Sequence, residues 1–122
     1  DDRRLGRGLR RAASASSSRP VSTMIAAFIG PYSSREALAR ASPVTYVSAD
    51  SPPFLIIHGK QDLLPHGQSI LMHEALTTAG ASSELLLIDG ATHAFDVVFD
   101  TEWTRKAIEA MDRTLDKWSG RK

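Results

Sequence analysis

The sequence contains no cysteine among its 122 residues, so disulfide bonds and thiolate metal sites are excluded. It also contains no GxGxxG motif, no P-loop, no HExxH and no EF-hand loop. No apolar run approaches the roughly 18–20 residues of a membrane-spanning helix, and the first residues lack the apolar segment of a secretory signal. The length of 122 residues allows one domain, and we expect no metal, organic cofactor or membrane partner. The absence of a signal or membrane segment slightly favours a cytoplasmic location, although the absence of cysteine does not fix the compartment.

Charge is distributed unevenly along the chain. The formal net charge is +1, but residues 1–20 contain six arginines and two aspartates, whereas residues 21–122 contain nine basic and twelve acidic side chains. The first segment is rich in arginine, serine, alanine and glycine, and it cannot bury enough apolar surface to offset its ordering entropy. No aromatic residue lies between these arginines to stack on bases. We therefore expect a disordered basic tail over 1–20, a partial domain over 21–122 and no nucleic-acid partner.

Two short apolar runs, 54–57 (FLII) and 84–88 (ELLLI), predict the centre of the fold. Each run is apolar at nearly every position, which is typical of parallel strands buried on both faces. Between them, a helix is predicted over 66–79, with Gly80 as its end. Its apolar positions follow a three-to-four spacing: Ile70, Leu71, Ala75, Leu76 and Ala79. Strand, helix and strand in this order predict a βαβ unit.

The flanking segments contain further helices. A short apolar helix is predicted over 21–29, and a second one over 36–41, with Ser33 and Glu36 as its capping box. Three prolines exclude a regular element over 43–53, where Tyr46 is expected to pack. The clearest helix is 101–118, and its apolar stripe is expected to face the core. That stripe consists of Trp103, Ala107, Met111, Leu115 and Trp118.

Asp62 and His93 each follow one of the two predicted strands. Loops that leave the same end of neighbouring parallel strands, which lie about 4.8 Å apart, can bring these side chains into hydrogen-bond contact. An imidazole is a good general base near neutral pH, and a carboxylate that accepts its other N–H fixes its tautomer. The pair is therefore predicted to be catalytic. Taken singly, each residue also fits an ordinary turn or surface role, and Asp89 and Asp96 are competing candidates for the acid.

The remaining histidines suit structural or surface roles. His58 closes its strand before a glycine and is expected to pack beneath the following loop. His66 and His73 lie seven residues apart on the predicted helix, which is too far for a shared pair of metal ligands. Both are expected to be solvated.

Four stretches together resemble a known family: 42–50 (SPVTYVSAD), 52–59 (PPFLIIHG), the group Asp62, Pro65, Gln68 and Ser69, and 90–95 (GATHAF). Over 21–118 the chain resembles the C-terminal third of α/β-hydrolase-fold serine esterases, in the carboxylesterase and lipase branch allied to feruloyl-esterase-like and prolyl-oligopeptidase-type hydrolases. The resemblance implies that Asp62 is the acid and His93 the base of a Ser-Asp-His triad. It also implies a small-molecule ester as substrate and no cofactor.

The triad nucleophile is missing from this sequence. In the resembled fold it lies on a G-x-S-x-G turn before the acid, and no serine upstream of Asp62 has glycine at those positions. An HGGG-type oxyanion motif is missing as well. We therefore expect a truncated α/β-hydrolase domain, inactive by itself, whose partner is the missing N-terminal part of the same domain. A prolyl-oligopeptidase-type peptidase fragment and a catalytically inactive α/β-hydrolase fragment remain alternatives.

Overall fold

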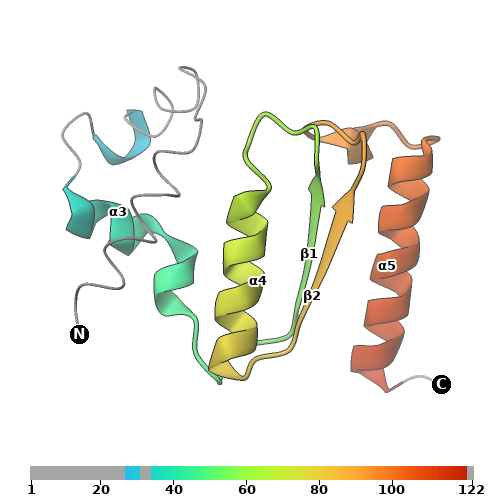
Figure 1. Cartoon of the computed structure of the whole chain (residues 1–122). Coiled ribbons are helices and arrows are strands. Elements are labelled where there is room, and N and C mark those ends of the chain that lie inside the picture. Colours follow the sequence, from blue (N-terminus) through green and yellow to red (C-terminus); the bar gives the residue numbers. More distant parts are fainter. Residues whose placement is uncertain (1–26, 31–33, 121–122) are drawn as a thin grey trace. The chain divides into compact units, whose positions relative to one another are not determined.

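A computed structural model describes residues 27–30 and 34–120. The chain divides into two compact units, Asp1–Tyr46 and Val47–Lys122, which we describe separately (Figure 1). The predicted tail over 1–20 and most of the predicted helix over 21–29 lie outside the described residues. Residues 27–29 are helical, and Gly30 follows with a φ of 108°. None of the helices in the described ranges is long and apolar enough to span a membrane.

The described part of the first unit contains helix α3, Arg35–Ala41, and the 3-10 helix η1, Pro43–Tyr46. Ser34 caps α3, since its Oγ accepts a hydrogen bond from the Ala37 amide at 3.2 Å. The cap predicted at Ser33 lies outside the described residues. The prediction of no regular element after residue 42 was wrong for η1, because proline needs no hydrogen-bonded N–H at the first helical position.

Tyr46 also differs from its predicted packing role. Its ring is exposed, and its hydroxyl donates a hydrogen bond to the Arg40 carbonyl at 2.7 Å. The hydroxyl explains the difference, because it attaches the ring to the C-terminal end of α3 rather than leaving it to pack among apolar side chains.

The second unit is built on the predicted βαβ arrangement. Strands β1, Phe54–Gly59, and β2, Ser83–Ile88, pair in parallel, with a register from Phe54↔Ser83 to Gly59↔Ile88. Helix α4, Gly67–Ala79, connects them and ends at Gly80, which has a left-handed φ of 87°. Helices α4 and α5 lie on opposite sides of the strand pair (Figure 1). The predicted order and parallel pairing are thus confirmed, although Leu71 of α4 is exposed.

Helix α5, Glu102–Ser119, packs on the strands through small residues. Its buried residues are Thr104, Ala107, Ala110 and Thr114. The predicted stripe was wrong at Met111 and Leu115, which are exposed. The buried threonine hydroxyls are satisfied, since Thr104 Oγ1 donates to the Val98 carbonyl at 2.7 Å and Thr114 Oγ1 to the Ala110 carbonyl at 2.6 Å. Hydrogen-bonded threonines therefore occupy the inner face that the hydrophobic pattern assigned to larger side chains.

Leu76 of α4 is fully buried. The core cluster of this unit lies between the strand pair and α5. It consists of the buried residues Ile88, Ala91 and Ala107, with Ile57, Leu86, Phe95 and Trp103 packed against them. Ala91 and Phe95 belong to the segment that carries His93, so the core fixes that segment on both sides of the histidine. This segment includes the 3-10 helix η2, Phe95–Val97.

Candidate functional site

The loops that follow β1 and β2 are joined backbone to backbone. The Lys60 amide donates to the Ile88 carbonyl, and the Gln61 amide donates to the Ala91 carbonyl, both at 2.9 Å. The two chains approach so closely here that a β-carbon on Gly59 would collide with the Ala91 carbonyl oxygen and lie 2.7 Å from its carbon. Glycine is therefore required at position 59, and the contact sets one loop directly against the other.

Asp62 and His93 meet across this junction. His93 Nδ1 lies 3.0 Å from Asp62 Oδ1 and 3.1 Å from Oδ2. Because a carboxylate only accepts hydrogen bonds, Nδ1 carries the hydrogen, and Nε2 of the neutral ring retains its lone pair. The His93 side chain is 52% exposed, whereas that of Asp62 is 11% exposed. The predicted contact is confirmed, and its catalytic role remains a prediction.

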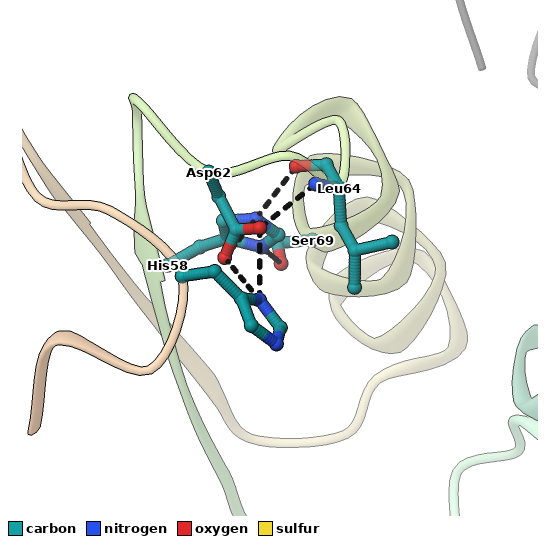
Figure 2. A network of polar contacts seen from close by, with 5 residues as sticks. His58, Asp62, Leu64 and Ser69 are labelled. Carbon is teal, nitrogen blue, oxygen red and sulfur yellow. Dashed lines mark hydrogen bonds and ion pairs between the residues drawn. The ribbon is translucent and has the colours of Figure 1, made fainter. Parts of the chain in front are cut away.

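Other groups hold the Asp62 carboxylate in place. The Leu64 amide donates to Asp62 Oδ1 at 2.8 Å, and His58 Nε2 lies 3.6 Å from Oδ2 (Figure 2). Burial raises the pKa of Asp62. The hydrogen bonds from Leu64 and His93, together with the charges of His93 and His58, outweigh burial, so the pKa of this carboxyl is lowered overall. Asp62 is thereby kept ionised as the partner of His93.

This lowered pKa predicts an acid-dependent loss of stability. The contribution of the Asp62 carboxylate should be complete above its unfolded pKa of about 3.9 and should be lost as the pH falls through the lower pKa of the folded protein. Urea unfolding of the wild type and of Asp62→Asn, between about pH 5 and pH 2, should therefore show a shallower loss in the variant.

Asp89 is the matched control for this pH measurement. Its carboxylate pairs with Lys60 at 2.8 Å, and its side chain is 87% exposed. The hydrogen bond and charge of Lys60 lower the pKa of Asp89 as well, but exposed ion pairs contribute little to stability, so Asp89→Asn should change the pH slope less than Asp62→Asn. Equal slopes for Asp62→Asn and the wild type would show that the Asp62 contacts do not stabilise the fold.

The backbone next to His93 has an uncommon conformation. Ala94 has a φ of 52° and is the only non-glycine residue with positive φ in the described part of the chain. This conformation costs about 1–2 kcal/mol in an L-residue. Beyond it, Thr104 Oγ1 contacts the carbonyls of Phe95 and Val98 at 3.3 and 2.7 Å. Packing and hydrogen bonds from α5 therefore hold the turn that presents His93.

The competing acids lie elsewhere. Asp89 binds Lys60, and among the described contacts none joins Asp89 or Asp96 to His93, whereas Asp62 contacts the ring with both oxygens. No group of three or more residues suited to a metal ion occurs in the ranges that the structure covers.

The other histidines are held by hydrogen bonds. His58 lies beneath the loop as predicted, with a side chain that is 13% exposed. Its Nδ1 contacts Ser69 Oγ at 2.7 Å and its Nε2 contacts the Leu64 carbonyl oxygen at 3.1 Å.

The expectation of a solvated His73 was wrong, since its side chain is half-buried and contacts Ser83 Oγ at 2.9 Å. His66 is also half-buried. The sequence analysis did not predict Ser69 as the hydrogen-bond partner of His58, because only the fold brings the first turn of α4 beside the end of β1.

The chain matches a family model. The model of the BD-FAE family matches residues 8–76, a range that begins inside the predicted tail, includes Asp62 and ends in α4. Among curated proteins, esterase LipQ of Mycobacterium tuberculosis is 37% identical over 84 residues, which is 67% of this chain and 20% of LipQ. The chain thus spans about a fifth of that relative.

Solved structures agree with this match. A thermophilic esterase of Thermogutta terrifontis, Est2, is similar with a TM-score of 0.59 and 32% identity, over 65% of this chain and 29% of Est2. An acetyl ester-xyloside bifunctional hydrolase of Caldicellulosiruptor lactoaceticus has a TM-score of 0.69 at 21% identity, over 75% of this chain and 34% of its own, and shows likeness of fold alone. The fold class predicted from the sequence, a partial α/β-hydrolase fold, is confirmed.

Proposed function

Because the chain belongs to the BD-FAE family, a family of α/β-hydrolase-fold esterases, we propose that it provides the acid and base of a carboxylic ester hydrolase. The observation that carries this proposal is the contact of His93 Nδ1 with both carboxylate oxygens of Asp62, at 3.0 and 3.1 Å. In the neutral ring this contact leaves the lone pair on Nε2 of a half-exposed imidazole, as a general base requires.

In the proposed reaction, His93 Nε2 takes the proton of a serine hydroxyl as the serine oxygen attacks the ester carbonyl. The imidazolium formed is stabilised by Asp62, which stays ionised. When the tetrahedral intermediate collapses, the C–O bond to the alcohol breaks and His93 returns the proton to the leaving oxygen. A water molecule then attacks the acyl-enzyme with the same proton transfers, releasing the acid and regenerating serine. These steps need no metal or organic cofactor.

The serine belongs, in this proposal, to an N-terminal part of the same domain that this sequence does not contain. Two observations support such a partner. The chain covers 20% of LipQ and 29% of Est2. In addition, α5 exposes the apolar residues Ile108, Met111 and Leu115, which recur at three- and four-residue spacing on one side of the helix and so form a surface suited to a further layer of a larger domain.

Short acyl esters are the proposed substrates. Est2 has structures with propionate bound and with butyrate bound, and both anions are products that a short acyl ester would release. The half-exposed position of His93 is consistent with access by a small substrate.

The experiment compares this chain alone with the chain joined to the serine-bearing segment of its own hydrolase. We expect no turnover of p-nitrophenyl propionate or butyrate by the chain alone and turnover by the joined protein. Cleavage of an aminoacyl-prolyl anilide instead of the esters would favour a prolyl-oligopeptidase-type peptidase. Inactivity of the folded, joined protein on all three substrates would favour a catalytically inactive α/β-hydrolase, and ester turnover by the chain alone would contradict the need for the partner segment.

A further inference from the structure

The imidazole of His58 links strand β1, the loop that follows it and helix α4 next to the candidate site. It projects from β1, its Nδ1 lies 2.7 Å from Ser69 Oγ in the first turn of α4, and its Nε2 lies 3.1 Å from the Leu64 carbonyl oxygen in the intervening loop (Figure 2). The side chain is 13% exposed, so solvent competes little for either contact. Its Nε2 also lies 3.6 Å from Asp62 Oδ2, and no proton transfer in the reaction proposed above involves this group.

The contact with Leu64 determines which nitrogen of His58 carries hydrogen. A carbonyl oxygen only accepts hydrogen bonds, so Nε2 must be the donor. In the neutral ring Nδ1 is then an acceptor, and the Ser69 hydroxyl donates to it. If the ring is protonated, Nδ1 donates to the same hydroxyl. Ser69 can therefore hold the ring in either state, and the Nε2–H group is directed at Leu64 in both.

Leu64 is consequently held at both of its backbone polar groups. Its carbonyl accepts from His58 at 3.1 Å, and its amide donates to Asp62 Oδ1 at 2.8 Å. The loop between β1 and α4 is short and carries exposed leucines at 63 and 64, so apolar packing does not fix its conformation. The carbonyl and the amide belong to consecutive peptide planes that meet at the Leu64 Cα, and the following Pro65 restricts the φ and ψ between them. Hydrogen bonding at the Leu64 carbonyl therefore limits the directions that the amide bound to Asp62 can take.

We infer that His58 is a positioning residue for the acid Asp62, acting through the Leu64 backbone, with Ser69 setting the orientation of its ring. The inference rests on the proposed function, because it assigns His58 to the same reaction. The alternative is that His58 simply fills space under the loop, and the two roles respond differently to substitution.

The first test uses the wild-type chain. Two-dimensional ¹⁵N–¹H spectra of the imidazole groups distinguish Nε2–H from Nδ1–H in neutral histidine. We expect the neutral ring of His58 to be in the Nε2–H form. The Nδ1–H form would overturn the inference, because its Nε2 could not donate to Leu64.

The second test compares side chains that reproduce one nitrogen each. Glutamine can place a donor near the Nε2 position, whereas asparagine reaches only the Nδ1 position. His58→Asn and Ser69→Ala should raise the pKa of Asp62 towards its ordinary value, measured from its ¹³C carboxyl shift, and His58→Gln should raise it least. In the serine-bearing hydrolase, His58→Asn should lower kcat about 10- to 100-fold with a smaller change in KM, and His58→Gln should restore much of that loss.

His73 provides the matched control. It is another half-buried histidine that contacts a serine, Ser83, at 2.9 Å, but this serine begins β2 and the pair therefore lies at the end of the sheet away from Asp62. His73→Asn should leave the pKa of Asp62 and kcat unchanged. Equal effects of His58→Asn and His58→Gln would indicate that His58 acts by filling space or by its charge 3.6 Å from Asp62 Oδ2, and would overturn the inference that it acts through Leu64. If His58→Asn does not fold, the pKa of Asp62 in Ser69→Ala and the tautomer of His58 in the wild type still test the inference.

The positioning role of His58 and the proposed hydrolase function can be tested independently of each other. If the tautomer and the pKa of Asp62 respond as expected but His93→Ala retains ester hydrolysis, His58 positions Asp62 and the hydrolase role is wrong. If His93→Ala abolishes hydrolysis while the His58 variants change neither readout, the hydrolase role stands and the positioning role is wrong.

Discussion

Replacing His93 with alanine in the serine-bearing hydrolase should lower kcat for p-nitrophenyl butyrate by a factor on the order of 10⁴ or more. The contact with Asp62 reserves Nδ1 for the carboxylate and leaves Nε2 as the acceptor of the serine proton. Alanine removes that acceptor. Because uniform substrate binding does not depend on proton transfer, KM should change much less than kcat.

The same replacement should leave the fold intact. The His93 side chain is 52% exposed, so its removal leaves no cavity, and the loss of its hydrogen bond to Asp62 should lower the free energy of unfolding by no more than about 3 kcal/mol. Thermal unfolding of His93→Ala therefore separates loss of chemistry from loss of structure. His73→Ala is the comparison for kcat, since it removes a histidine from the opposite end of the sheet. Wild-type kcat in His93→Ala would refute the assignment of His93 as the base.

The meeting of Asp62 and His93 could be predicted from sequence because it follows from topology. Two apolar runs separated by one helix predict parallel neighbours, and the residue that follows each run then lies at the same edge of the sheet. The observed register, which ends at Gly59↔Ile88, places both loops where that argument requires. No knowledge of side-chain packing was needed for this step.

Features that depend on local hydrogen bonding could not be predicted in the same way. The inner face of α5 contains Thr104 and Thr114, whereas a hydrophobic pattern assigns the core to methionine and leucine. The hydroxyls can be buried only because carbonyls of Val98 and Ala110 accept from them. Those partners become visible only once the backbone path is known.

The hydrogen bond between His58 and Ser69 could not be predicted from the sequence for a related reason. The residues are eleven positions apart, on a strand and on the following helix, and their contact depends on how the loop between them turns. Local spacing predicts contacts within one helix or across one strand pair, but it does not predict the orientation of a helix that follows a loop. Tyr46, whose hydroxyl binds the Arg40 carbonyl, is a similar case.

Gly59→Ala should cost the fold about 3 kcal/mol, near the upper end of the range for overpacking a well-packed site. An added β-carbon would collide with the Ala91 carbonyl oxygen and lie 2.7 Å from the carbonyl carbon. Both atoms belong to the backbone, so no side-chain rotation can relieve the collision. The loops after β1 and β2 must move apart, which weakens the hydrogen bond from the Gln61 amide to the Ala91 carbonyl. Urea unfolding measures the loss.

This separation should also disturb the candidate site, because Ala91 and His93 belong to one loop and Gln61 and Asp62 to the other. Amide hydrogen exchange at Gln61 should quicken, and the pKa of Asp62 should rise as His93 withdraws. Gly67→Ala is the control: a β-carbon there meets no atom within 4 Å, and alanine favours the first turn of α4, so stability should be unchanged or higher by up to about 1 kcal/mol. Equal stability of Gly59→Ala and the wild type would mean that the loops after β1 and β2 can move apart at little cost. Their close approach would then not be what holds Asp62 against His93.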